Sequence, residues 1–277
     1  QYLFDEIGFY ANSTGTDKTS LVFQTGSEKE PVIADLHTEG GLGVSGSSHD
    51  RAYDNYSWCE PFKAGIAKQE GLSSTIPSLK SLTIQGWFWM EEAQSSYINP
   101  INGTVNLATL MRGPFMLDMT AGTTEVGLTF RVGTTKATSA RSYLITNEWV
   151  FFTITYDKTK STNNVNFYVG TKTQPVTLVS THTLDIDLRT DLNFQLGGHS
   201  PAGDGMFYGR LDNIRLYGSR TDGTGVLSIE ELEKIRAIDL MPLESGPLEL
   251  DEEFKSRFMV PLQKWGYLRF RNVQRTS

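Results

Sequence analysis

Hydrophobic residues recur along this chain in short runs, separated by turns rich in Gly, Asn, Asp and Ser. Residues 81–90 and 149–156 are apolar on both faces, which is typical of strands in the middle of a sandwich. Residues 164–169 alternate, so Val165, Phe167 and Val169 are expected to face inward. Short strands at regular spacing with turn signals between them predict an all-β fold, a two-sheet antiparallel β-sandwich of the jelly-roll type.

The same pattern predicts further strands along the chain, whereas residues 26–71 are rich in Gly, Ser and Asp and are expected to be irregular. A loop of that length in a compact domain is usually functional or held by a specific interaction. The further predicted strands are residues 2–9, 20–24, 105–111, 114–119, 126–132, 141–145, 175–180, 192–197 and 206–217.

One short helix is expected after the last core strand. Ser228 is a good N-cap and Glu231 follows three residues later, which is a capping box. Pro242 is expected to stop the helix. The sequence therefore divides into a sandwich over residues 1–241 and a C-terminal extension over residues 242–277, with a possible extra strand. The predicted apolar stripe of the helix is Ile229, Leu232 and Ile235.

Residues 209–218 are predicted to form one long strand with two different faces. Ile214 and Leu216 are expected to face the core, and strict alternation places Asp212 on that same face. Leu211 and Arg215 then fall on the opposite face. A buried carboxylate needs a hydrogen-bonded partner, a cation or a metal ion, so Asp212 is a candidate site residue.

Composition excludes some functions. The net charge is −7 and no block of Lys or Arg forms a stripe, so no nucleic acid is expected as a partner. No apolar run reaches the length of about 20 residues that spans a bilayer. Cys59 is the single cysteine, so no disulfide forms within the chain. A start at Gln1 with strand-like residues is expected of a mature secreted protein.

Candidate catalytic chemistry is sparse. Asp185 and Asp187 are two residues apart, so on a strand they would share one face, as the paired carboxylates of a glycosidase do. No Glu follows them at a suitable spacing. The histidines are scattered without the spacing of metal ligands. We therefore expect that the protein is not an enzyme, and keep a glycosidase-like protein as an alternative.

Aromatic residues are candidates for ligand binding, because sugar rings stack on exposed aromatic faces. Tyr53, Tyr56 and Trp58 lie in the long irregular region, away from the predicted strands, and are the candidate contact residues. Trp87 and Trp149 lie within apolar strands and are expected to belong to the core.

Four motifs in order carry a family resemblance. They are Leu-Thr-Ile-Gln-Gly-Trp-Phe at 82–88, Glu-Trp-Val-Phe-Phe-Thr-Ile-Thr-Tyr-Asp at 148–157, Val-Asn-Phe-Tyr-Val-Gly at 165–170 and Gly-Arg-Leu-Asp-Asn-Ile-Arg-Leu-Tyr at 209–217. Over about residues 2–241 the chain resembles the laminin G-like domains of the concanavalin A-like lectin/glucanase superfamily. It looks most similar to secreted bacterial members, in which segments like 43–46 and 50–55 also occur.

The resemblance implies a secreted or cell-surface binding and adhesion module that recognises a glycan or a surface protein. It also implies a structural calcium ion at Asp212, for which Asp5, Asp50 and Asp54 are candidate partners. The first and last strands of a jelly roll tend to lie side by side, which would bring Asp5 near Asp212. The alternative is that Asp212 caps a turn or pairs with Arg51 or Arg210.

A second function hypothesis is a self-assembling structural subunit of a surface layer, sheath or filament. The segment from Trp265 to Val273 alternates and has no place in the parent fold, so it could add to an exposed sheet edge of a neighbouring copy. The segment from Tyr2 to Phe9 could do the same and form a homo-oligomer.

Overall fold

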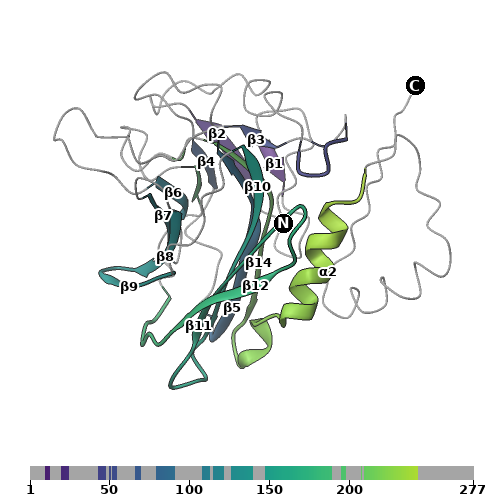
Figure 1. The fold of residues 1–277 in the computed structure, drawn as a ribbon. Helices are drawn as coiled ribbons and strands as arrows, with labels where there is room; N and C mark the ends of the chain where they lie inside the picture. Colours follow the sequence, from purple (N-terminus) through teal and green to yellow (C-terminus); the bar gives the residue numbers. More distant parts are fainter. Residues whose placement is uncertain are drawn as a thin grey trace.

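The fold is seen in a computed structural model of the 277-residue chain (Figure 1). Statements below concern the residues that this structure describes. These are residues 10–12, 20–24, 43–47, 50, 52–54, 66–69, 79–90, 108–112, 115–121, 126–139, 147–188, 195–197, 207 and 209–242.

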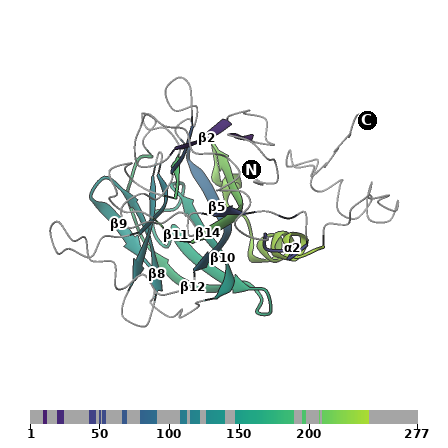
Figure 2. The same ribbon diagram turned by 90° about the horizontal axis from the view of Figure 1, so that it is seen from above.

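Two antiparallel sheets face each other, which confirms the predicted β-sandwich (Figures 1 and 2). The six-stranded sheet has the order β12 (Thr177–His182), β11 (Val165–Thr171), β10 (Glu148–Asp157), β5 (Ser81–Met90), β14 (Arg210–Ser219) and β3 (Tyr53–Asp54). The eight-stranded sheet has the order β1 (Tyr10–Asn12), β2 (Ser20–Gln24), β4 (Ile66–Gln69), β13 (Gln195–Leu196), β6 (Ala108–Arg112), β7 (Met116–Ala121), β8 (Val126–Val132) and β9 (Thr135–Thr138).

The central strands β5 and β10 are apolar on both faces because each face meets a different partner. On the inner face, Ile84, Phe88 and Phe152 pack in the main core between the sheets. On the outer face, Trp87 and Phe151 meet edge to face, with ring centroids 5.2 Å apart. They belong to a second cluster that includes residues of helix α2.

Helix α2 (Ile229–Asp239) lies on the outer face of the six-stranded sheet (Figure 2). Ser228 caps it through the predicted capping box with Glu231. Leu232 is buried and Ile235 packs beside it, but Ile229 is exposed, so the predicted stripe is wrong at that residue. The turn before the helix is the 3-10 element η2 (Gly223–Gly225).

A β-bulge interrupts β14 and changes which side chains face the core. Between Asp212 and Arg215 the register with β5 shifts, and Asn213 has a φ of 50°. Leu211 and Ile214 therefore both pack in the main core, while Asp212 pairs with Trp87 on the outer face. The prediction that Asp212 shares a face with Ile214 and Leu216 is wrong, because it assumed an uninterrupted alternation.

The long region 26–71 contains two short strands that the sequence did not predict. The strand β3 pairs with the start of β14, and β4 pairs with β2 and β13. The described first strand, β1, pairs with β2 in the eight-stranded sheet, whereas β14 lies between β5 and β3 in the other sheet. The predicted first strand, residues 2–9, lies outside the described residues, so the expectation that it lies beside the last strand stays a prediction.

Candidate functional site

Residues 43–47 and residue 50, together called the segment 43–50, lie beside β14. The Gly43 N–H donates to the Asp50 carbonyl oxygen at 2.5 Å, and the Asp50 N–H donates to the Ser47 carbonyl oxygen at 3.0 Å. Gly46 turns the chain with a φ of 73°, a conformation that suits glycine. Asp50 is thereby returned to the start of the segment, next to Gly43.

Two buried carboxylates receive backbone N–H groups in this segment. Asp212 is 0% exposed, and its Oδ2 accepts from the Val44 N–H at 2.9 Å. Its Oδ1 accepts from the Asn213 N–H at 2.6 Å. Asp50 is 1% exposed, and its Oδ2 accepts from the Ser45 N–H at 2.7 Å. These bonds stabilise the charged carboxylates and hold the segment against β14.

The two carboxylates meet at Gly43. A Cβ atom on Gly43 would lie 2.5 Å from Asp50 Cγ and 2.8 Å from Asp212 Oδ2. A side chain at this position would thus collide with both carboxylates, and only glycine lets them approach the same point. Two buried carboxylates this close repel each other, and a cation bound between them would offset that repulsion.

A third oxygen-bearing side chain follows Asp212 directly in the bulge. Asn213 is 1% exposed, and neither its Oδ1 nor its Nδ2 has a hydrogen-bond partner in the part of the chain that the structure describes. A buried amide without a partner is costly and usually points to an unseen water, ion or ligand. Carboxylate and amide oxygens are the atoms that calcium prefers.

The oxygen atoms of these side chains are of the kind that binds calcium. Calcium takes six to eight oxygen ligands, so these side chains alone do not complete a site. Across the described ranges, no three His, Cys, Asp or Glu side chains gather as a metal-binding group. A calcium site here would therefore use Asp50 and Asp212 together with amide and backbone carbonyl oxygens. Asp5 lies outside the described residues, and Asp54 is described only by its backbone, which pairs with Arg210.

The structure describes Tyr53 but not the other two predicted aromatic contact residues. Tyr53 is fully buried in the main core, so its ring is not available at the surface. Tyr56 and Trp58 lie outside the described residues. At the same end of the sheet, the Arg210 guanidinium stacks 4.4 Å from the ring centroid of the half-buried Trp89, an arrangement that the sequence analysis missed.

Asp185 and Asp187 do not form a catalytic pair of the expected kind. They lie in the irregular stretch after β12, where both are exposed, and not on a strand face. Asp187 pairs with Lys158, whose hydrogen bond and charge lower the pKa of the Asp187 carboxyl. A general acid of a glycosidase needs the opposite shift.

Three residues after Asp212 in the sequence, a second buried charge cluster holds helix α2. Arg215 donates to both carboxylate oxygens of Asp239, at 2.7 Å and 2.5 Å. The Trp87 indole N–H donates to Asp239 Oδ2 at 2.9 Å. Burial disfavours the charged guanidinium, but Asp239 outweighs it and raises the pKa of Arg215. The sequence analysis missed this pair. Asp239 lies in the last helical turn, and an Asp residue is almost never fully buried unless it is paired.

Residues 70–223 match the family Laminin_G_3, described as the concanavalin A-like lectin/glucanases superfamily. The chain belongs to this superfamily. The match covers all the strands of the six-stranded sheet except β3, and it includes Asp212. Asp50 and the segment around Gly43 precede the matched range.

Several solved structures are similar in fold to this superfamily member. One is domain 4 of AbnA, a GH43 extracellular arabinanase from Geobacillus stearothermophilus, in complex with arabinotriose, with 14% identity, a TM-score of 0.42 and coverage of 84% of this chain and 85% of that one. A second is the CBM40 of the Ruminococcus gnavus IT-sialidase bound to alpha2,3 sialyllactose, with 14% identity, a TM-score of 0.41 and coverage of 61% and 97%.

A third similar structure is a heptameric SAP-like pentraxin from Limulus polyphemus, with 10% identity, a TM-score of 0.41 and coverage of 59% of this chain and 72% of that one. No curated protein sequence matches the chain. Within the described ranges, no helix has both the length and the apolar character needed to cross a bilayer.

Proposed function

We propose that this protein is a non-catalytic extracellular binding module that recognises a carbohydrate or a cell-surface partner and holds a structural calcium ion at Asp50 and Asp212. The observation that carries the proposal is the meeting of these two buried carboxylates at Gly43. The superfamily description, which includes lectins, supports a carbohydrate as the ligand.

The chain's own residues explain what the site would do. The Val44 N–H donates to Asp212 and fixes the segment 43–50 to β14, and the Ser45 N–H donates to Asp50 within the segment. Calcium, when bound, supplies the positive charge that offsets their repulsion. Because β3 follows this segment in the sequence, the site would also position β3.

An extracellular location agrees with this proposal. Extracellular calcium modules have dissociation constants of about 10⁻⁴–10⁻³ M, which suit sites with few acidic ligands. A site with two carboxylates and neutral oxygens is of this kind. The same site would remain largely empty at the much lower calcium concentrations of a cytosol.

Calcium titration of the metal-stripped protein tests the ion site. At a calcium concentration about 100 times the dissociation constant, the free energy of unfolding should rise by about 2.7 kcal/mol. Asp212→Asn and Asp50→Asn should lose this rise. Asp187→Asn is the matched control, because Asp187 is exposed and paired with Lys158, and it should keep the full rise. If calcium leaves the free energy of unfolding of the wild-type protein unchanged, the site is excluded.

Glycan-array binding tests the ligand. We expect binding that Tyr56→Ala and Trp58→Ala weaken, and that Tyr53→Phe leaves unchanged because Tyr53 belongs to the core. Binding should survive Asp185→Asn combined with Asp187→Asn. Loss of binding in that double variant, or release of reducing sugar, would favour a glycosidase-like protein instead.

Self-assembly remains a separate prediction, since the segments from Tyr2 to Phe9 and from Trp265 to Val273 lie outside the described residues, as does most of the proposed extension 242–277. Sedimentation of the full chain and of a chain without residues 242–277 tests it. Polymers that disappear on deletion would support a structural subunit.

A further inference from the structure

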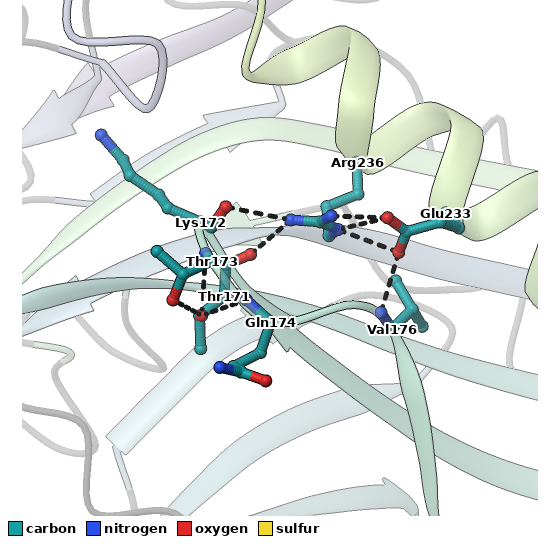
Figure 3. Close-up of polar contacts among 7 residues, drawn as sticks. All are labelled: Thr171, Lys172, Thr173, Gln174, Val176, Glu233 and Arg236. Carbon is teal, nitrogen blue, oxygen red and sulfur yellow. Dashed lines mark hydrogen bonds and ion pairs between the residues drawn. The ribbon is translucent and has the colours of Figure 1, made fainter.

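The loop between β11 and β12 is held in place by helix α2. Arg236 Nη1 donates to the carbonyl oxygens of Thr171 at 2.6 Å and Lys172 at 3.3 Å (Figure 3). At the other end of the loop, the Val176 N–H donates to Glu233 Oε2 at 2.8 Å. The Lys172 backbone is thus fixed to the helix on both sides of the loop.

Further hydrogen bonds form within the loop and between the two helix residues that hold it, Glu233 and Arg236. Arg236 and Glu233 form a bidentate ion pair, in which Arg236 Nε donates to Glu233 Oε2 at 2.9 Å and Arg236 Nη2 donates to Glu233 Oε1 at 2.5 Å. Within the loop, Thr171 Oγ1 accepts the N–H groups of Thr173 and Gln174 (Figure 3). A backbone held by this many bonds gives the Lys172 side chain a defined starting point.

The Lys172 carbonyl oxygen faces the Arg236 guanidinium, whereas the Lys172 side chain extends away from that guanidinium (Figure 3). The sheet places the loop on the side of the acidic site, because Asp212, Trp87, Phe151 and Gly170 occupy one row across β14, β5, β10 and β11. On this outer face, Val44 of the segment 43–50 and Val176 of the loop belong to the same apolar cluster.

The charges of the two carboxylates influence the pKa of Lys172. Partial burial lowers the pKa of Lys172, while the charges of Asp50 and Asp212 act in the opposite direction and favour its charged form. The residue is exposed overall, so its ammonium can move away into solvent. Lys172 is therefore an exposed positive charge on the same side of the sheet as a buried pair of negative charges.

We propose that Lys172 is an affinity-determining residue of the Asp50–Asp212 site, whose ammonium group acts as a built-in competitor of the calcium ion. The inference rests on the proposed calcium site and adds the residue that sets its strength. In the metal-free protein, Lys172 offsets part of the repulsion between the carboxylates. In the calcium-bound protein, the same charge repels the ion and turns toward solvent.

The test compares calcium binding by calorimetry in three variants of the full chain. Lys172→Met removes the charge and keeps the length of the side chain, so its Kd should fall about tenfold. Lys172→Arg keeps the charge, so its Kd should stay within about twofold of the wild-type value. Lys160→Met is the matched control, because Lys160 lies after the opposite end of β10, 3.7 Å from Asp157, and it should leave Kd unchanged.

A second measurement does not depend on bound calcium. In the presence of a chelator, Lys172→Met should lower the melting temperature relative to wild type, and Lys172→Arg should not, because only the first variant leaves the carboxylates without this charge. Adding calcium should reverse the order. A role in packing alone would give the same melting difference with and without calcium.

The outcomes separate the two proposals. If wild type and Asp212→Asn bind calcium equally, or neither binds it, the calcium site itself is excluded and the role of Lys172 falls with it. If Asp212→Asn abolishes binding but Lys172→Met leaves Kd unchanged or raises it, the calcium site stands and the inference about Lys172 is overturned.

Discussion

Two buried charge clusters lie three residues apart on β14 and differ in the charges that they bring together. At Arg215 the chain brings together opposite charges, since Asp239 of helix α2 accepts two hydrogen bonds from the guanidinium. At Asp212 the chain brings together like charges, since Asp50 reaches the same point beside Gly43. Both clusters are buried on the outer face of one sheet.

The difference indicates what each cluster is for. A buried pair of opposite charges balances itself and fixes the position of the helix relative to the sheet. A buried pair of like charges stores repulsion, which an added cation relieves. The first cluster is thus a structural contact, and the second is where we propose that a cation binds.

The largest effect is expected from breaking the first cluster. Arg215→Met leaves Asp239 charged and buried, which should cost about 3–5 kcal/mol of unfolding free energy. Urea denaturation measures this loss. Combining Arg215→Met with Asp239→Leu removes both charges and should recover most of it. A single variant that loses less than about 1 kcal/mol would show that water reaches Asp239.

A smaller effect is expected from crowding the second cluster. Gly43→Ala places a Cβ atom against both carboxylates, which should cost about 1–3 kcal/mol, as overpacking does. The variant should also lose its stabilisation by calcium. Gly46→Ala is the control, because it has open space but a φ of 73°, so it should be destabilised by backbone strain while its response to calcium persists. Melting curves with and without calcium separate the two causes.

The smallest effect concerns the bulge that joins the clusters. Asn213 adopts a φ of 50°, so Asn213→Ala should be less stable than Asn213→Gly by about 1 kcal/mol. If its buried amide oxygen helps to bind calcium, both variants should respond less to calcium than wild type. Equal stability of the Ala and Gly variants in urea would show that the bulge relaxes without cost.

Much of the sandwich could be predicted because its longest strands are specified locally. The predicted bounds of β5 and β8 agree with the structure, since both strands are continuous apolar or alternating runs. Strands of two to four residues, such as β3, β4 and β9, could not be predicted. Such short segments become strands only because a neighbouring strand supplies their hydrogen bonds.

The candidate site was predictable only in part. Asp212 could be singled out because a carboxylate inside an apolar strand needs a partner, and Asp50 was among the candidates offered. That the two meet at Gly43 depends on a turn at Gly46 and a segment folded over the sheet. Tyr53 illustrates the converse, because a residue in an irregular stretch proved to belong to the core.

The sequence by itself determined the two apolar central strands, the capped helix and the superfamily, because each depends on the order of neighbouring residues. Tertiary structure alone decided the face on which Asp212 lies. The bulge at Asn213 adds one residue to β14 opposite β5, and this reverses the alternation that sequence reasoning extended through the strand. Whether a carboxylate there meets Asp50, Arg215 or the core depends on contacts between segments far apart in the chain.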